Sequence, residues 1–160
     1  MKIYHKIFFL IALLLSSNLS AQTASLSLAG ANHDISLPVE ILANNLSIDQ
    51  STNSAIFEGS AYVAQGLIRL NADKIEVIYN QETSEVSIIK ATGNVLFTNG
   101  EDIAEAKSAI YKTDNGLLKM TGNILLIQGK NTISGDSLEM NILNNTANLT
   151  GNVRTTLTPN

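Results

Sequence analysis

Apolar and polar residues alternate along most of the chain. On either side of Gly59, the residues Ala55, Phe57, Ala61 and Val63 share one parity, and the residues between them are mostly polar. The alternation returns at residues 75–79. A period of two is typical of β-strands with one buried face and one face toward water. The pattern therefore predicts a two-strand module.

This module recurs about four times, which two interleaved anchors make visible. The first anchor is a glycine followed by a small or polar residue and then an apolar one. The second is an Ala or Gly, which follows the glycine by 13 residues in each complete copy. One insertion of five residues, around residues 80–87, accounts for the irregular spacing. Such a period indicates an internal repeat. The glycines are Gly59, Gly93, Gly122 and Gly151, and the second anchors are Ala43, Ala72, Ala106 and Gly135.

The repeat predicts an all-β fold. Turn-forming residues separate the alternating segments, and no stretch of ten or more residues beyond the N-terminal region has helical periodicity. A long sheet with one apolar face must curl, fold over on itself or close. Periodicity leaves open whether that face is a filled core or a groove for alkyl chains.

The N-terminal residues have the pattern of a secretory signal peptide. Lys2 and Lys6 precede an apolar run at residues 7–15, and small residues end at Ala21. A retained membrane anchor is the rival interpretation, but a spanning helix needs roughly 20 residues. We therefore expect a cleaved signal peptide at residues 1–21, a flexible segment at 22–33 and one β domain at 34–158. Because the chain has no cysteine, a lipoprotein anchor and disulfides are excluded.

Charge and motifs argue against several classes of function. The net charge is −4, and it becomes −6 without Lys2 and Lys6 (8 basic against 14 acidic residues), so no broad basic field for nucleic acid is expected. His33 is the only histidine after residue 21, which disfavours histidine-based catalysis or a metal site. The acidic cluster of Glu101, Asp102 and Glu105 is interpreted as a solvated turn. No nucleotide-binding glycine motif is present. Neither an enzyme nor a cofactor is expected.

Both ends of the predicted sheet have edge strands. Residues 34–41 alternate, and Pro38 within them cannot donate to a ladder, which is typical of an edge. A short last strand is expected around residues 153–157. Uncapped edges offer N–H and C=O groups to another chain. The expected contact joins the first strand to the last and is head-to-tail; its residues are Leu37, Val39, Val153 and Thr155.

Several of these segments resemble the OstA-like family. The resemblance rests on VAQG at residues 63–66, LNADKIEV at residues 70–77 and a recurring Thr-Gly-Asn at residues 92–94, 121–123 and 150–152. It extends over about residues 35–158. It implies a folded-over, twisted antiparallel sheet resembling an open β-jelly-roll, with both ends open.

The resemblance also implies a function. Members of this family carry lipopolysaccharide from the inner to the outer membrane through the periplasm. The apolar N-terminal run is too short for the spanning helix of an inner-membrane, LptC-like member, and no barrel sequence follows as in an outer-membrane, LptD-like member. The expectation is a soluble periplasmic bridge, with lipopolysaccharide, LptC-like and LptD-like proteins and further copies of itself as partners.

Candidate site residues follow from the inward-facing positions. The expected lipid-binding groove consists of Val39, Ile41, Phe57, Phe97, Tyr111, Leu118 and Met140. Of these, Val39, Phe97 and Tyr111 fall near positions that resemble lipid-contacting strands of the family. The alternative is that all seven are ordinary core residues. A rim that meets sugar phosphates is a further hypothesis, with Arg69, Lys74 and Lys107 as its members, although such cations on the wet face of a strand commonly serve only solvation.

Two other classes of function fit parts of the pattern. A secreted structural or adhesin-like β-repeat protein would have a filled core and no lipid ligand. A polysaccharide-active enzyme on a β-solenoid would need acidic residues clustered on one face, which the spacing does not supply.

Overall fold

A computed structural model describes residues 37–144 and 146–158. In this part of the chain all regular structure is β, and ten strands form one antiparallel sheet. The all-β prediction is confirmed. The strands are β1 (Glu40–Leu42), β2 (Asn45–Asp49), β3 (Ser54–Gln65), β4 (Ile68–Tyr79), β5 (Val86–Asn99), β6 (Asp102–Lys112), β7 (Leu117–Gln128), β8 (Asn131–Asn141), β9 (Thr146–Thr150) and β10 (Arg154–Thr156).

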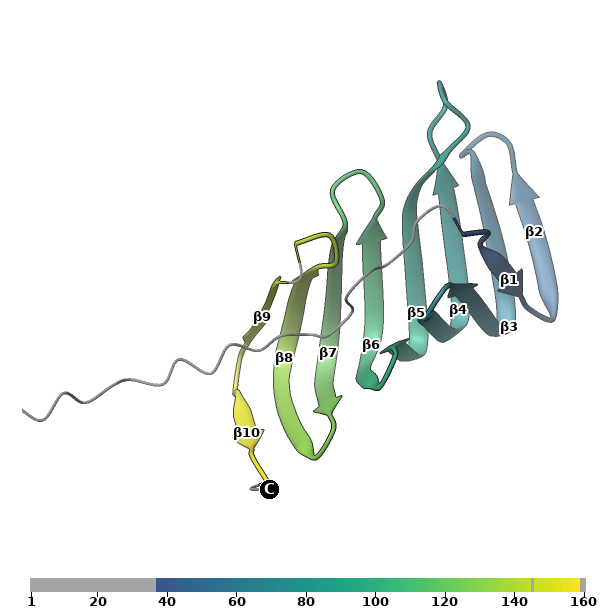
Figure 1. The fold of residues 1–160 in the computed structure, drawn as a ribbon. Coiled ribbons are helices and arrows are strands. Elements are labelled where there is room, and N and C mark those ends of the chain that lie inside the picture. Colours follow the sequence, from purple (N-terminus) through teal and green to yellow (C-terminus); the bar gives the residue numbers. More distant parts are fainter. Residues whose placement is uncertain (1–36, 145, 159–160) are drawn as a thin grey trace, which may run out of the picture.

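The strands follow one another across the sheet in chain order (Figure 1). At one edge β1 and β2 both pair with β3, each along a different half of it. At the other edge β9 and β10 both pair with β8, each along a different half of it. Each edge is thus a single strand position interrupted in the middle, and the six strands between them are long and continuous.

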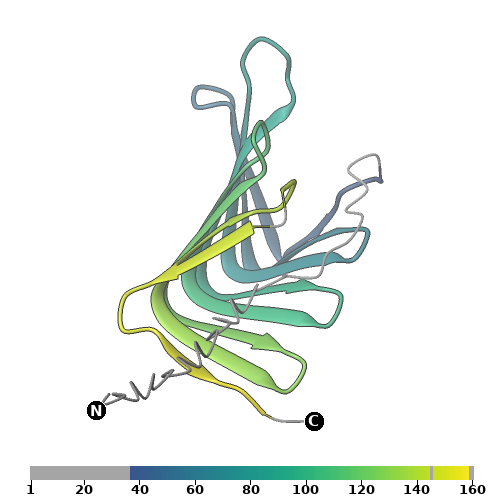
Figure 2. The same ribbon diagram turned by 60° about the vertical axis from the view of Figure 1, so that its left-hand side comes forward.

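The long sheet folds over on itself at a line of corners. Each corner is a glycine and the residue after it, both with positive φ, as at Gly93 (79°) and Asn94 (46°). The ladder register shifts there, between Thr92 and Val95 in β5, so the corner acts as a β-bulge that bends the strand. Figure 2 shows the result as a V made of two arms. The corners are Gly59–Ser60, Gly93–Asn94, Gly122–Asn123 and Gly151–Asn152.

Close packing explains why glycine is used at the corners. A Cβ on Gly93 would lie 2.2 Å from Oδ2 of Asp73, the residue after the second anchor Ala72. Asn94 then donates from Nδ2 to the Asp73 carboxylate at 2.9 Å. Asn152 donates to Asp136 in the same way at 2.8 Å. The corner glycine of one strand therefore packs against the residue that follows the second anchor of the neighbouring strand.

The third corner differs from these two. Lys107 occupies the place of Asp73 and Asp136, and its aliphatic stem packs over Gly122, whose added Cβ would lie 2.9 Å from the Lys107 Cβ. The geometry needs a side chain that covers the glycine, and a lysine stem serves as well as a carboxylate.

The sheet has an arm on each side of the corners. The hairpin arm carries the tight turns after Gln65, Asn99 and Gln128, and the loop arm carries the longer connections. The predicted five-residue insertion falls in the connection between β4 and β5, which Asn80 closes by donating its backbone N–H to the Glu85 carbonyl at 2.8 Å. The repeat therefore tolerates the insertion, because it lies in a connection at the end of the loop arm and not within a strand.

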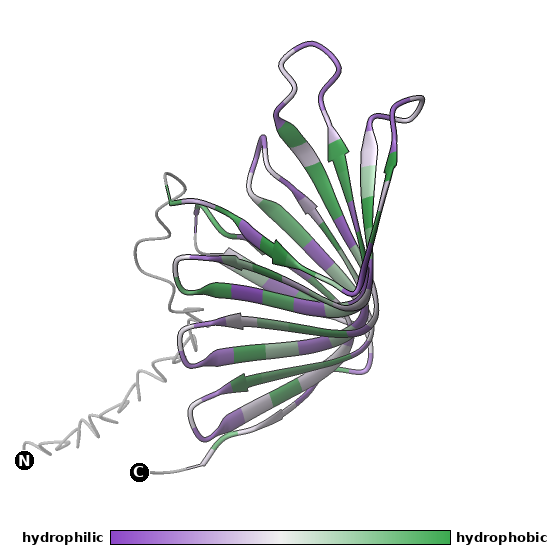
Figure 3. Cartoon of the chain, turned by 90° about the vertical axis from the view of Figure 1, so that its right-hand side faces the viewer, coloured by the Kyte–Doolittle hydropathy of each residue, from purple (hydrophilic) through white to green (hydrophobic). Residues whose placement is uncertain are grey.

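Inward-facing residues line up in rows across the sheet, at least one in each arm, and every long strand contributes one residue to each row. Figure 3 shows the alternation of hydropathy along the strands that produces them. The hairpin-arm row is Ile41, Val63, Leu70, Phe97, Ala104, Leu126, Ile133 and Thr155. The loop-arm row is Leu46, Phe57, Ile75, Ala91, Ala109, Met120, Leu138 and Leu149.

The core lies between the arms and is most complete in the loop-arm row. Ile75, Met120 and Leu138 are 0% exposed. Each buried aliphatic side chain of this size contributes about 1.5–3 kcal/mol through burial. The folded-over sheet therefore supplies its own second layer and needs no helix to cover its apolar face.

The first strand differs from its prediction. It was expected within residues 34–41, but β1 begins at Glu40 and ends at Leu42. Pro38 lies just before it, where the missing N–H removes no ladder bond. The predicted signal peptide (1–21) and flexible segment (22–33) lie outside the described residues. Within residues 37–144 and 146–158, no helix has the length and hydropathy to cross a membrane.

Candidate functional site

An apolar cavity of about 60 Å³ lies between the two arms. Its walls come from both sides of the V: Val63, Leu70 and Phe97 belong to the hairpin-arm row, whereas Tyr111 and Leu118 lie on the loop arm. The corners bring these residues together because they turn each strand back over the same interior. The complete lining is Val39, Val63, Gln65, Ile68, Leu70, Ile89, Phe97, Tyr111, Leu118 and Ile142.

The apolar interior continues along the sheet beyond this cavity. A small void of about 10 Å³ follows, and its lining includes one amide and one carboxylate side chain: Phe97, Asn99, Asp102, Ile103, Ala104, Leu126 and Met140. Phe97 separates the two spaces and contributes to both. We call the two spaces and their lining the groove. It runs across the strands, in the direction in which the sheet would continue.

Most residues predicted for the groove lie in its walls. Val39, Phe97, Tyr111 and Leu118 line the larger space, and Met140 lines the smaller one. The other two predicted members, Ile41 and Phe57, are partly buried and pack against the core cluster. That these two side chains contact a lipid stays a prediction.

Sequence reasoning did not assign to the groove six of the ten residues that line the larger space. Leu70 and Ile68 precede a second anchor, and only the positions after that anchor had been used to assign faces. Extending the alternation backwards from Ala72 would have found both. Ile142 directly follows β8 and has the same parity as Leu138 and Met140, which had been assigned to the inward face. Gln65 has the same parity as Val63 in β3, so alternation places its amide on the apolar side.

Two polar groups belong to the lining of the larger space. The Tyr111 side chain is partly buried, and this burial raises the pKa of its hydroxyl above the ordinary value of 10.0, so it is neutral at physiological pH. Gln65 donates from Nε2 to the Leu37 carbonyl at 2.9 Å. This hydrogen bond holds the segment before β1 against the larger space, and Val39 of that segment joins its lining. The groove contains no charged side chain in its larger space.

The three predicted rim cations lie apart from one another. Arg69 donates from Nη1 to the Ile68 carbonyl at 2.8 Å and also to the Gly66 carbonyl, next to the hairpin turn. Lys74 forms an ion pair with Glu58 at 3.3 Å across neighbouring strands. Lys107 covers the third corner. None of the three lines the groove, and contact with phosphate stays a prediction.

The predicted edge residues lie at the two ends of the sheet. Leu37 and Val39 are exposed and precede β1, whereas Val153 and Thr155 are exposed at β10. Their apolar members are about half exposed, at 42% for Leu37, 50% for Val39 and 51% for Val153. A contact through them stays a prediction.

The acidic cluster is dispersed by the fold. Asp102 accepts a hydrogen bond from Gln128 at 3.4 Å, while Glu101 and Glu105 are exposed. In the described part of the chain, no three His, Cys, Asp or Glu side chains gather in a way that would hold a metal ion. His33 lies outside the described residues.

Comparisons with known proteins agree with this architecture. The fold resembles the crystal structure of LptH, described as the LptA homologous periplasmic component of the conserved lipopolysaccharide transport device from Pseudomonas aeruginosa, with a TM-score of 0.72. The match covers 80% of this chain and 100% of LptH at 14% identity, so it concerns the fold alone. No curated protein matches the sequence.

A family model matches the sequence itself. It is described as LptA/(LptD N-terminal domain) LPS transport protein, and it spans residues 40–146, from the first strand to the start of β9. This range includes every corner but the last and the whole lining of the groove except Val39. The resemblance stated from the sequence is thereby confirmed, and the chain belongs to the LptA/(LptD N-terminal domain) family of LPS transport proteins.

Proposed function

We propose that this protein is a periplasmic bridge that binds lipopolysaccharide and carries it from the inner to the outer membrane. The acyl chains of the lipid occupy the groove between the two arms. The signal-peptide pattern at residues 1–21 supports a periplasmic location, as does the similarity to LptH, a periplasmic component.

The apolar cavity is the observation that carries this proposal. Its lining is aliphatic and aromatic apart from Gln65 and the Tyr111 hydroxyl, and it lies between two arms that no covalent link closes. Burial of an acyl chain contributes about 0.8 kcal/mol per methylene. A few methylenes therefore outweigh the repulsion between a phosphorylated lipid and a chain of net charge −6 after removal of residues 1–21.

The size of the cavity has a mechanical consequence. At about 60 Å³ it is far smaller than the roughly 300–1,000 Å³ of typical ligand pockets. A complete acyl chain enters only when the arms separate or when the segment at Val39 moves from the mouth. In this proposal, binding of an acyl chain therefore widens the V.

Transfer to other proteins uses the open edges. In this proposal similarly folded LptC-like and LptD-like proteins, and further copies of this chain, join head-to-tail at β1/β2 and β9/β10. The groove runs toward both edges, so the joined sheets give the lipid a continuous apolar path. Because the larger space contains no charged side chain, no ion pair holds the lipid at one place.

Photo-cross-linking tests lipid binding. A photoreactive phenylalanine analogue at Phe97 or Tyr111 is expected to label lipopolysaccharide in the purified protein. The same analogue at Ile110, which is 43% exposed and adjacent in β6 to Tyr111 on the opposite face, is the control and is expected to give little labelling. Labelling from Ile110 equal to that from Tyr111, or none from any position, would contradict a lipid-filled groove.

A further inference from the structure

A second cavity, which is polar where the groove is apolar, lies at the free end of the loop arm. Its volume is about 240 Å³, and its lining comes from residues within 48–54 and 79–84. These are the connections β2–β3 and β4–β5 with the strand ends beside them. Figure 1 shows the tips of the two connections at the same end of the sheet. We call this cavity the tip pocket.

The tip pocket lies on the inward face of the sheet, as the groove does. Its residue Ile48 belongs to a row of inward-facing residues that also contains Ile89, Tyr111 and Leu118, which line the groove. Tyr79, another residue of the pocket, packs against the core cluster. The pocket is therefore a polar end of the apolar interior.

Hydrogen bonds within the two connections hold the walls of the pocket. The backbone N–H of Tyr79 donates to the Asn53 carbonyl at 2.9 Å and so ties one connection to the other. In the second connection, Oδ1 of Asn80 accepts from the backbone N–H groups of Glu82 at 2.8 Å and Thr83 at 3.1 Å. The pocket thus keeps its shape without a ligand, which lowers the cost of binding one.

The five-residue insertion supplies one wall. Asn80, Gln81 and Ser84, which line the pocket, all lie in the β4–β5 connection that contains the insertion. The equivalent connections β6–β7 and β8–β9 are shorter, so the pairing of the strands does not require the additional residues. The insertion adds a surface to the sheet, and that surface is the pocket wall.

Amide side chains supply most of the hydrogen-bonding groups in the pocket. Those of Gln50, Asn53 and Gln81 make no hydrogen bond to another described residue. Each amide has two N–H donors and a carbonyl acceptor. The pocket therefore presents donors and acceptors together, which suits a ligand whose groups do both.

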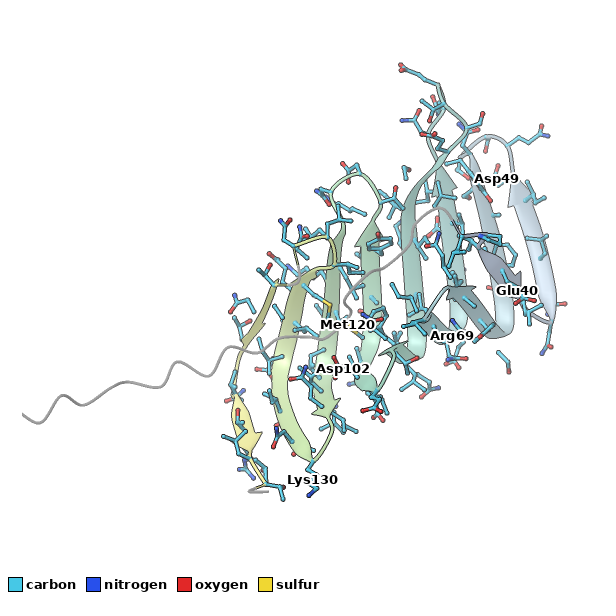
Figure 4. All side chains as sticks on the ribbon, in the orientation of Figure 1. Glu40, Asp49, Arg69, Asp102, Met120 and Lys130 are labelled. Carbon is cyan, nitrogen blue, oxygen red and sulfur yellow. The ribbon has the colours of Figure 1, made fainter. Side chains whose placement is uncertain are left out.

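The charge in the pocket excludes an anionic ligand. Side-chain and backbone hydrogen bonds from Ser51 hold the pKa of Asp49 below its ordinary value, so this carboxylate is ionised at neutral pH. Figure 4 shows Asp49 at this end of the sheet. The lining contains no Lys or Arg residue. A phosphate here would be repelled by the carboxylate and would meet no cation.

We propose that the tip pocket binds a sugar ring that carries no charge. Sugar hydroxyls donate to the Asp49 carboxylate and exchange hydrogen bonds with the amides. The ring of Tyr79 and the side chain of Ile48, which is 71% exposed, provide apolar surface for the C–H groups of the sugar. A volume of about 240 Å³ is below the roughly 300–1,000 Å³ of pockets for drug-sized ligands and suits a single ring.

Two sources provide such a ring, and they share this chemistry. One is a sugar of the lipopolysaccharide whose acyl chains occupy the groove, in which case the inference rests on the proposed function. The other is a free chain of N-acetylated hexoses. The row that joins Ile48 to the groove residues favours the first source, because one glycolipid then contacts both places.

Nuclear magnetic resonance titration tests the site. Isotope-labelled protein is titrated separately with oligosaccharide released from lipopolysaccharide by mild acid, with tri-N-acetylchitotriose and with inorganic phosphate. Backbone amide shifts are expected to change at residues 48–54 and 79–84 with a sugar and not with phosphate. A response to the released oligosaccharide identifies the glycolipid as the source, and a response to chitotriose alone identifies a free glycan. No response to either sugar, or an equal response to phosphate, would overturn the proposal.

A double variant shows whether the amides make the contact. Gln50→Ala with Gln81→Ala is expected to weaken sugar binding about tenfold through the loss of two hydrogen bonds. The matched control is Glu82→Ala, which is next to Gln81 in the same connection but outside the lining, and it is expected to leave the affinity unchanged. Equal effects of the double variant and the control would contradict binding in the tip pocket.

Failure of this inference differs from failure of the proposed function. If neither sugar binds while photoreactive residues at positions 97 and 111 still label lipopolysaccharide, the tip pocket is not a sugar site and the lipid-binding role stands. If a sugar binds but no lipid is labelled, the sugar site stands and the lipid-binding role is wrong.

Discussion

Two consecutive residues with positive φ form each corner, and they determine where the sheet bends. Glycine is required at the first of them for two separate reasons. Its backbone is left-handed, which costs other residues about 1–2 kcal/mol, and the side chain from the second-anchor strand lies where a Cβ would be. The second residue is Asn at three corners and Ser at one, and Asn is the residue that best tolerates this conformation after glycine.

Two alanine substitutions distinguish the cost of the left-handed backbone from the cost of the steric contact at the Cβ position. Gly100→Ala is expected to lose about 1 kcal/mol of stability, since Gly100 has a φ of 64° but no atom within 4 Å of its added Cβ. Gly93→Ala is expected to lose more, because its Cβ would overlap the Asp73 carboxylate. Urea denaturation of both variants measures the difference. Equal losses would show that the contact with Asp73 is unimportant.

At the scale of elements, each long strand contributes to both arms and to both faces. In β7, Met120 faces the core and is 0% exposed, whereas the next residue toward the N-terminus, Lys119, is exposed. Met120 is the fourth residue of β7 and is labelled in Figure 4. The strand is held by its two neighbours and by the opposing arm, so the contribution of each residue depends on which face it occupies.

Alanine substitutions in β7 test this division. Met120→Ala is expected to lower the free energy of unfolding by about 2–5 kcal/mol, because it leaves a cavity in a packed row. Lys119→Ala, on the same strand but on the wet face, is expected to change it by about 0.5 kcal/mol or less. Chemical denaturation followed by circular dichroism measures both. A small loss for Met120→Ala would mean that the loop-arm row is loosely packed.

At the scale of the whole molecule, the fold is an open V whose interior is apolar and whose surface has a slight excess of acid. The corners form its closed side and the turns of the two arms form its open side (Figure 2). Because the sheet closes on neither edge, one molecule is a segment of a structure that can be extended. In the proposed function, retention of a lipid in this interior depends on hydrophobic burial and not on attraction between charges.

If hydrophobic burial outweighs charge attraction in this way, the salt dependence of lipid binding follows. Affinity for lipopolysaccharide is expected to stay constant or rise slightly as sodium chloride is increased, because salt screens the repulsion between an acidic protein and lipid phosphates. Titration with a fluorescent lipopolysaccharide at low and high salt measures it. A steep loss of affinity with salt would indicate that phosphate contacts, such as those suggested for Arg69, Lys74 and Lys107, dominate binding.

The sequence alone determined the repeat and the strand faces. Alternation assigns a side to each residue because the strand period is two, so Phe97, Tyr111 and Met140 were placed inward without coordinates. The glycine and second-anchor spacings also located the one insertion, and they marked the positions that the structure shows to be corners. Local patterns suffice for these features because each is imposed by the backbone of a single strand or by one pair of neighbouring strands.

The tertiary structure decided which inward residues form a groove and which form a sealed core. Leu118 and Met120 have the same parity in β7, yet Leu118 lines the cavity and Met120 packs in the loop-arm row. The outcome depends on the angle between the arms and on the segment at Val39, which are set by contacts between residues far apart in the chain. The pairing of Asp73 with Gly93 likewise became visible only when the corner brought them together. Periodicity carries no information about such distances, because it records the side on which a residue lies and not what lies opposite.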